Sequence, residues 1–228
     1  MFFIYSDNLK HGRLQLGVIL LISLQIIFYC LSEFIGNLRI DKEYPLHFIP
    51  ALFSIKPFVY SYTLITATFL HTGFWHLFGN VMFFLAIART LERLFGTTIF
   101  LSSYLLIGAL AYLGDWLISP NSITPIVGSS GAVAFLMGVY LMLFPSSKLR
   151  LFVTMIVFYR RFWIPAYVFL LVWFFLQTYD FVLEDGNHQV AYATHIFGFI
   201  LGTIVAMAWK ELAVDTERKI EELKEEIQ

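Results

Sequence analysis

The chain has 228 residues, of which 59% are hydrophobic, 18% aromatic and only 14% charged, with a formal net charge of -1. Its mean hydropathy of +0.75 excludes an ordinary water-soluble domain, in which about 25% of residues are charged, and indicates a polytopic membrane protein. The charge provides no basic field for nucleic acid, and a single cysteine, Cys30, excludes a disulfide framework and a cysteine-based metal site.

Six apolar runs follow one another along the chain. A helix needs about 20 mostly apolar residues to cross the ~30 Å hydrocarbon core, and a single segment can satisfy its backbone there only as a helix. No small-residue cleavage site follows the first run, so we expect it to be a retained helix and not a signal peptide. The pattern predicts an all-α membrane bundle with spans near residues 14–36, 75–95, 98–118, 129–145, 162–181 and 192–210.

The distribution of Lys and Arg predicts the orientation of the spans, because cytoplasmic loops carry an excess of both residues. If the N-terminus is cytoplasmic, only Arg39, Lys42 and Lys56 lie outside. We therefore expect both termini to be cytoplasmic, and the compact six-span form favours a bacterial plasma membrane. The inner cations are then Lys10, Arg13, Arg89, Arg93, Lys148, Arg150, Arg160, Arg161, Lys210, Arg218, Lys219 and Lys224.

Three segments outside the spans are unusual. Residues 37–74 are rich in Phe, Tyr and Pro, and we expect this long outer loop to lie in the membrane surface and to be functional. The nine mostly apolar residues 151–159 are too few to span, so this stretch should lie at the inner interface before Pro165 opens the fifth helix. The charged tail, residues 211–228, should be helical, either as a solvated extension of the last span or as a weak self-association stripe.

Polar side chains at membrane depth are costly and indicate function. His76 and Asn80 share one face at the start of the second span, Ser129 and Ser130 open the fourth, and His195 lies in the first turn of the sixth. Because alternate spans run in the same direction, all five residues are expected at the outer end of the bundle. The sequence therefore predicts one polar site assembled from three helices.

This set of residues is suited to nucleophilic catalysis. A neutral His195 can take the proton of Ser130 as the hydroxyl attacks a carbonyl, provided that the two side chains come within about 2.6–3.2 Å. His76, the Asn80 amide and the backbone N–H of Ser130 can donate hydrogen bonds to the resulting oxyanion. No carboxylate lies near His195 in the sequence, so a dyad is expected in place of a triad. The chemistry requires no metal or other cofactor.

Small residues on two of these spans predict the close approach that the pair requires, because small-xxx-small faces let membrane helices touch backbone to backbone. Ser129 is expected to cap the fourth helix with its side chain. Each motif alone has a structural explanation, as a helix-start turn, a hydrogen-bonded histidine or a packing face, but their shared depth and direction favour catalysis. The small residues are Gly128, Gly131, Gly138, Gly198 and Gly202.

In this order and spacing, the motifs resemble those of the rhomboid family of intramembrane serine proteases. HTGFWHLFGN is similar to the histidine and asparagine motif of the family's second helix, LERLFG to the glutamate and glycine that follow, GSSG to the nucleophile motif Gly-x-Ser-Gly, and HIFGFILG to the motif of the last helix. The matching residues are His71, His76, Asn80, Glu92, Gly96, Gly128, Ser130, Gly131, His195, Gly198 and Gly202.

The resemblance implies a six-helix rhomboid protease domain over residues 1–210. It implies that Ser130, and not Ser129, is the nucleophile and that His195 is the base. Structural roles are implied for His71, as a loop anchor, and for Glu92, as a packing and ion-pair residue near the inner end of the second span. The implied reaction is hydrolysis of peptide bonds in or near the transmembrane helix of a membrane protein, within a water-filled cavity open to the outer face.

The sequence departs from the family pattern at three places. Thr194 stands where an alanine is common, and adds a hydroxyl beside His195. Ala134 replaces a tyrosine that stacks on the histidine in many members, so support for the ring must come from elsewhere. Tyr62 and Thr63 replace a Trp-Arg pair of the first loop.

Two other classes of function remain as alternatives. One is a non-proteolytic rhomboid-like protein that binds membrane clients without cutting them, against which the retained Ser130 and His195 argue. The other is a transporter or channel, whose polar site is expected near the midplane of the membrane. The confinement of the polar residues to one end of the bundle argues against that class.

Overall fold

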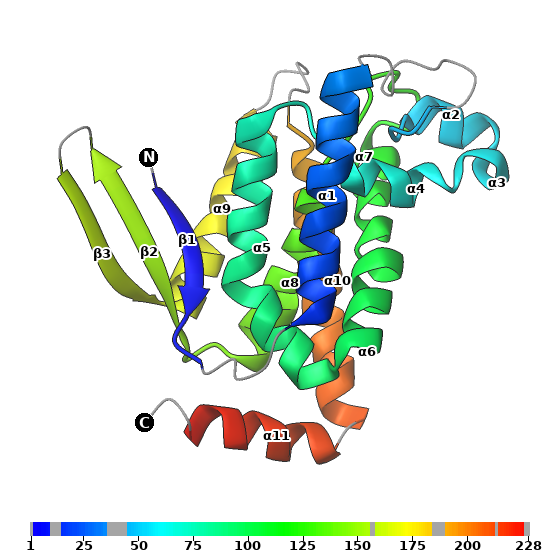
Figure 1. The fold of residues 1–228 in the computed structure, drawn as a ribbon. Helices are drawn as coiled ribbons and strands as arrows, with labels where there is room; N and C mark the ends of the chain where they lie inside the picture. The colour runs from blue at the N-terminus through cyan, green and yellow to red at the C-terminus, as the bar shows by residue number, and fades with distance from the viewer. Residues whose placement is uncertain are drawn as a thin grey trace.

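The computed structural model describes residues 2–9, 15–35, 45–155, 158–183, 190–212 and 214–225; four of the cations compared above, Lys10, Arg13, Arg39 and Lys42, lie outside these ranges. Within them, long helices stand side by side in a bundle (Figure 1). Five of these helical segments are long and apolar enough to cross a membrane, and the expected class, a helical membrane bundle, is confirmed. They are α1 (Leu16–Ile35), α5 (Phe74–Phe95), the irregular segment Thr97–Ile118, α9 (Ala166–Leu183) and α10 (Tyr192–Leu212).

The sixth expected span is the central helix α8 (Ser130–Leu143), which has only 14 residues. Every residue from Gly131 to Tyr140 is buried, as expected for a helix that is apolar on all faces and enclosed by other helices. The neighbouring segment Thr97–Ile118 changes helix type several times along its length. It consists of α6 (Thr97–Ser102), the π-helix η2 (Ser103–Ile107), the 3-10 helix η3 (Ala109–Tyr112) and α7 (Leu113–Ile118).

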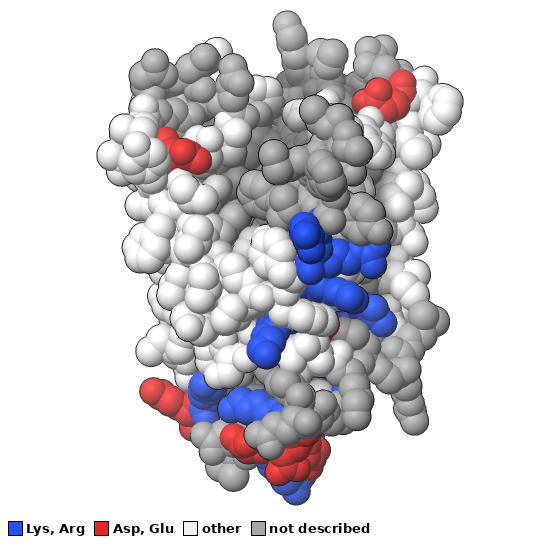
Figure 2. All heavy atoms as spheres, turned by 90° about the vertical axis from the view of Figure 1, so that its left-hand side faces the viewer, with Lys and Arg blue, Asp and Glu red and all other residues white. Residues whose placement is uncertain are grey.

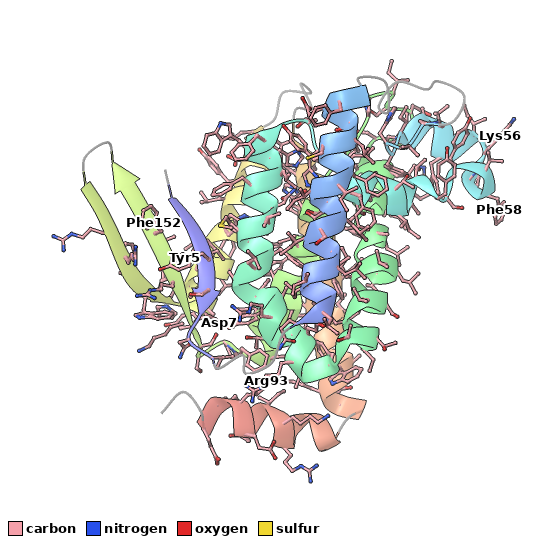
Figure 3. All side chains as sticks on the ribbon, in the orientation of Figure 1. Tyr5, Asp7, Lys56, Phe58, Arg93 and Phe152 are labelled. Atoms are coloured by element: carbon pink, nitrogen blue, oxygen red, sulfur yellow. The ribbon has the colours of Figure 1, made fainter. Side chains whose placement is uncertain are left out.

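The loop between α1 and α5 folds into short helices beside one end of the bundle, here called the site end (Figure 1). Phe48 pairs with Ile126 in an isolated bridge, and the Tyr62 hydroxyl donates to the Pro45 carbonyl at 2.9 Å, so contacts other than a Trp-Arg pair hold the described part of the loop in place. Phe58 is 95% exposed and points outward from the tip near Lys56 (Figure 3). The helices are α2 (Pro50–Ile55), α3 (Pro57–Tyr60), α4 (Thr63–Thr66) and the 3-10 helix η1 (Ala67–Phe69).

A three-stranded antiparallel sheet, which the sequence analysis did not predict, lies beside α5 and α9 (Figure 1). Its strands, in spatial order, are β1 (Phe2–Asp7), β2 (Lys148–Met155) and β3 (Phe158–Pro165). The stretch expected as an interfacial segment is therefore a strand pair, and the fifth helix begins at Ala166 and not near 162. The physical reason is long-range pairing, in which Asp7 lies opposite Leu149 and Phe2 opposite Val153.

A buried polar cluster joins β1 to α5 and α8 at the end of the bundle opposite the site end. The Asp7 carboxylate, 5% exposed, accepts hydrogen bonds from the hydroxyls of Thr90 and Tyr140, and Ser147 donates to Tyr140 at 2.9 Å. Figure 3 shows Asp7 at the base of β1. Since each of these polar groups is paired, the cluster can remain buried and fix the far end of α8.

The helix α11 (Val214–Glu225) lies across this opposite end, here called the α11 end (Figure 1). Its Ile220 and Leu223 are only 3% and 5% exposed and join the main core, so the tail is neither a solvated extension nor a free self-association stripe at these positions. On the face that Figure 2 shows, Lys and Arg gather over the sheet and the α11 end. Arg150, on β2, lies 5.2 Å from the centre of the Trp163 ring, within range of a cation-π contact.

Candidate active site

The structure brings Ser130 and His195 together at the site end. Ser130 is the first residue of α8 and His195 lies in the first turn of α10. The Ser130 Oγ atom is 2.8 Å from the Nε2 atom of His195, which is within hydrogen-bonding distance. Both side chains are half-buried, so the pair is enclosed by helices but reachable from a cavity.

The distance follows from backbone contact between α8 and α10. A methyl group on Gly202 would fall inside contact distance of the Phe135 carbonyl oxygen, and one on Gly138 would meet the Phe199 carbonyl in the same way. Gly131 and Gly198 lie against each other near the pair, because a methyl on Gly198 would overlap the Gly131 carbonyl. Four of the five small residues predicted to pack at the site therefore lie in this single helix contact.

Two residues of α9, which the sequence analysis did not single out, hold the His195 ring. The Nδ1 atom of His195 is 2.5 Å from the Oε1 atom of Gln177, and the Trp173 ring lies against the imidazole with centroids 6.0 Å apart. Ala134, where a stacking tyrosine is common in the family, is fully buried. The aromatic contact with the His195 ring thus comes from Trp173 of α9 and not from a residue of α8. A glutamine within an apolar span was the available signal, because polar groups are costly there.

Thr194 does not modify the His195 ring as expected. Its side chain is 1% exposed, and its methyl group faces Gly131, where an added Cβ would lie 2.6 Å away. The backbone N–H of Thr194 instead donates to the Asp115 carboxylate at 2.7 Å. Asp115 therefore caps the start of α10, where the helix dipole favours a negative charge.

His76, Asn80 and Gly128 form a corner of the site on the side of α5. Gly128 has φ +121°, and a Cβ there would lie 2.7 Å from the Nε2 atom of His76 and 3.5 Å from the Asn80 Nδ2 atom. Among the described residues, the buried Asn80 Nδ2 atom has no hydrogen-bond partner. The Nδ1 atom of His76 lies 3.0 Å from the Thr72 hydroxyl, so its Nε2 atom is the ring nitrogen beside Gly128. Two side-chain nitrogens thus flank a space that only a glycine leaves open.

Ser129 is the N-cap residue of α8, as expected, but its side chain makes no cap hydrogen bond and belongs to a separate, fully buried network. Its hydroxyl donates to the Oε1 atom of Gln25 on α1 at 3.0 Å. His71 lies on the other side, with its Nε2 atom 3.5 Å from the same hydroxyl, and its ring meets that of His76 edge to face at 5.1 Å. Gln25, which the sequence analysis also missed, therefore ties α1 to the start of α8.

Glu92 lies at the α11 end, far along α5 from His76, and is 2% exposed. Its carboxylate accepts hydrogen bonds from the backbone N–H groups of Gly17 and Val18, at 2.7 and 2.8 Å, and from the Thr97 hydroxyl at 2.7 Å. These partners show that Glu92 caps the amino terminus of α1. The contact explains why the carboxylate can be buried, and it supplies hydrogen-bond donors in place of the ion pair that the resemblance implied.

Two cavities meet at this site. One, of about 340 Å³, lies among the loops of the site end and is lined by polar side chains that include Thr72, Asp115 and Ser119. The other, of about 370 Å³, lies between α5, α8 and α9 and is lined by apolar and aromatic side chains that include Trp75, Phe83 and Trp173, as well as by Gln177. The residues common to both are His76, Asn80, Ser130, Val190 and His195.

The described residues contain no group of three or more His, Cys, Asp or Glu side chains that could hold a metal ion. Cys30 is a free, exposed thiol.

Comparison with known proteins agrees with this architecture. The rhomboid domain family matches residues 60–211, which is more than half of the chain, so the chain belongs to the rhomboid family. It is 30% identical over 128 residues to "Rhomboid-like protein 11, chloroplastic" of Arabidopsis thaliana, covering 56% of this chain and 42% of that protein. It is 41% identical over 78 residues to "Putative rhomboid protease YdcA" of Bacillus subtilis (strain 168), covering 34% and 39%. The matches thus span less than half the length of these relatives.

Proposed function

We propose that this integral membrane protein is an intramembrane serine endopeptidase, which hydrolyses peptide bonds in or near the transmembrane helix of other membrane proteins. The observation that carries the proposal is the 2.8 Å contact between Ser130 Oγ and His195 Nε2. It occurs beside a buried amide donor of Asn80 that has no partner among the described residues. A nucleophile, a base and a hydrogen-bond donor without a partner among the described residues therefore face the same space.

In the acylation step, Ser130 Oγ attacks the carbonyl carbon of the scissile peptide bond while His195 Nε2 takes the hydroxyl proton. The C–N bond then breaks as the imidazolium returns this proton to the leaving amine. The product is an ester between Ser130 and the acyl part of the substrate. His195 is neutral again and can serve the second step.

The tetrahedral intermediate carries a negative charge on the former carbonyl oxygen. The Asn80 Nδ2 atom, the His76 Nε2 atom and the backbone N–H of Ser130 at the start of α8 are the donors proposed for it. In the proposed arrangement the Thr72 hydroxyl, 3.0 Å from His76 Nδ1, donates to that nitrogen, so the proton of the neutral ring lies on Nε2 and points into the space beside Gly128. Loss of one donor of this kind costs about 10²- to 10³-fold in rate.

The two cavities suit the two substrates of hydrolysis. Water reaches the ester through the cavity at the site end. As it attacks the acyl carbon, His195 Nε2 takes a proton from it. The bond between the acyl carbon and Ser130 Oγ then breaks, the imidazolium returns the proton to Oγ, and the carboxylic acid product leaves. A substrate segment enters the apolar cavity between α5 and α9. Because an intact helix keeps its amides hydrogen-bonded, the segment must unwind before Ser130 can reach a carbonyl, which favours substrates with helix-destabilising residues.

The proposed orientation has the α11 end in the cytoplasm and the site end open to the outer face. It is supported by the Lys and Arg side chains gathered over the sheet and the α11 end (Figure 2). The compact six-helix form favours a bacterial plasma membrane. Cysteine accessibility tests this orientation in a Cys30→Ala background, which removes the native exposed thiol: Phe58→Cys should react with a membrane-impermeant maleimide added to intact cells, whereas Glu221→Cys should react only after lysis.

Reconstitution tests the activity. The purified protein in lipid vesicles is mixed with a panel of labelled single-span substrates that carry helix-destabilising residues, and cleavage is followed by gel and mass spectrometry. Wild type should cleave at least one of them, whereas Ser130→Ala and His195→Ala should be inactive. Ser129→Ala is the matched control, because it removes the neighbouring hydroxyl but retains the Ser130 and His195 pair, and it should remain active.

Two results would reject the proposal. One is a folded wild type that cleaves no substrate and whose Ser130 does not react with a fluorophosphonate probe. The other is cleavage that persists in Ser130→Ala. Binding of the panel without cleavage would instead support a non-proteolytic protein that retains membrane clients.

A further inference from the structure

The His195 ring has a hydrogen-bonding partner on each of its two nitrogen atoms. Ser130 Oγ lies 2.8 Å from Nε2, and Gln177 Oε1 lies 2.5 Å from Nδ1. The two partners come from different helices, α8 and α9, and they lie on opposite sides of the ring. The site therefore contains a third polar side chain in line with the proposed dyad.

The amide oxygen of Gln177 determines which tautomer the His195 imidazole adopts. Oε1 of Gln177 can only accept a hydrogen bond, so Nδ1 of His195 must carry the proton. In a neutral ring the other nitrogen, Nε2, then has a free lone pair, and this pair faces the Ser130 hydroxyl. The opposite tautomer would direct an N–H group at Ser130, where it could not take a proton.

Trp173 lies one helical turn before Gln177 and contacts the same ring, with centroids 6.0 Å apart. Residues at i and i+4 share a helix face, so one face of α9 supplies both the stacking contact and the hydrogen bond. Only 17% of the α9 span is buried, compared with 44% of the α5 span. The orientation of His195 thus depends on a helix that is held by few neighbours, and it is complete only while α9 lies against α10.

We propose that Gln177 is a positioning residue that holds His195 as the Nδ1–H tautomer, with Nε2 free to accept the proton of Ser130. The proposal rests on the protease function proposed above. It assigns to an uncharged amide the orienting part that a carboxylate plays in Ser-His-Asp proteases. Unlike a carboxylate, the amide stabilises the imidazolium only through its dipole, so its loss should cost less than the about 10⁴-fold that follows loss of the orienting group in a triad.

Three variants test the role by kinetics in vesicles. Gln177→Leu has a similar volume and no acceptor, and it should lower kcat by about 10- to 100-fold with KM within about 2-fold, because it alters the proton transfer and not substrate binding. Gln177→Glu keeps an acceptor oxygen at the same reach and should recover most of the rate. Thr178→Val is the control on α9, because the Thr178 hydroxyl bonds the Phe174 carbonyl of its own helix at 3.0 Å; it should match wild type.

A spectroscopic measurement shows which nitrogen of His195 is protonated, and it needs no substrate. In protein labelled with ¹⁵N-histidine, the His195 signals are assigned by their absence from His195→Ala, and ¹H–¹⁵N correlations identify the protonated nitrogen. Wild type should show Nδ1 protonated and Nε2 unprotonated, and Gln177→Leu should show a mixture of tautomers.

The proposal is overturned if wild-type His195 carries its proton on Nε2, or if folded Gln177→Leu keeps both the wild-type tautomer and the wild-type kcat. It also fails if Gln177→Glu is as slow as Gln177→Leu while its thermal unfolding is unchanged. These results are distinct from failure of the protease function, which would appear as a wild type that neither cleaves nor reacts with a fluorophosphonate. The tautomer of wild type remains measurable even if a variant does not fold.

Discussion

Gly202 lies directly against the carbonyl group of Phe135, with no space between the two backbones for a side chain. The contact joins α10 to α8, the two helices that carry His195 and Ser130. The distance between base and nucleophile is therefore set partly by a residue without a side chain, two turns along α10 from the histidine.

We expect Gly202→Ala to lower kcat/KM by about 100-fold, because a displacement of about 1 Å at a catalytic pair can cost that much. The methyl group must push α10 away from α8. The measurement is cleavage in vesicles, with fluorophosphonate labelling of Ser130 as a second readout. Gly73→Ala is the control, because a Cβ at Gly73 meets nothing within 4 Å; equal rates in both variants would contradict the packing argument.

Replacement of Gly128 should affect chemistry more than stability. A Cβ at this position would lie 2.7 Å from His76 Nε2, in the space beside the Asn80 amide, so Gly128→Ala should lower kcat by about 10²- to 10³-fold, the cost of one lost oxyanion donor. Gly96→Ala is matched for backbone strain, since Gly96 also has a positive φ but nothing within 4 Å of its Cβ position. It should lose about 1–2 kcal/mol of stability and keep its kcat; a similar loss of kcat in Gly96→Ala would count against the oxyanion assignment.

Removal of the Glu92 carboxylate should destabilise the fold without a direct effect on catalysis. Glu92→Ala leaves two N–H groups of α1 and the Thr97 hydroxyl without their acceptor, and we expect a loss of about 1–3 kcal/mol. Denaturation in detergent, followed by fluorescence or circular dichroism, measures the change. Among the described residues, the exposed Glu221 pairs only with Lys224, in the same turn of α11, so Glu221→Ala should change stability by less than about 0.5 kcal/mol. A stable Glu92→Ala protein that fails to cleave would contradict the structural assignment.

Ser129 and Gln25 should behave as a coupled pair. Ser129→Ala removes the donor to Gln25 Oε1, and Gln25→Leu removes the acceptor of the Ser129 hydroxyl, which still lies 3.5 Å from His71 Nε2, whereas the double change removes both members of the 3.0 Å bond. We therefore expect the double variant to be more stable than the sum of the single effects by about 0.5–1.5 kcal/mol. A double-mutant cycle of unfolding free energies measures this coupling energy between Ser129 and Gln25. Strictly additive losses would show that the hydrogen bond contributes nothing to stability.

The helical part of the fold was predictable because each span carries its own signal, a long apolar run. The sheet was not, because β1 and β2 are separated by most of the chain. Its stability comes from pairing between residues such as Asp7 and Leu149, which no local pattern reveals. The position of α11 was missed for the same reason, since Ile220 and Leu223 become part of the core only through contacts with distant helices.

At the site, Ser130, His195, His76 and Asn80 were found from the sequence because they belong to motifs with fixed spacing. Gln177 and Gln25 belong to no such motif and act through contacts 18 and 104 residues away in the sequence. Their only local signal is an amide within an apolar helix. The role of Glu92 shows the complementary case, in which the residue was identified but its partners, Gly17 and Val18, could be known only from the structure.

The shortness of α8 has a consequence for where a substrate can be cut. Its 14 residues extend about 21 Å, roughly 9 Å less than the hydrocarbon core of a membrane. If the α11 end of α8 lies at the inner edge of the hydrocarbon core, as the proposed orientation implies, this shortfall falls at the site end, above Ser130. Under the proposed function, a helix crossing the same bilayer would present to Ser130 a bond about six residues inside its apolar segment, at 1.5 Å per residue. The enzyme would thus measure cleavage depth by helix length, with the distance fixed by the architecture of α8 and not by recognition of a sequence.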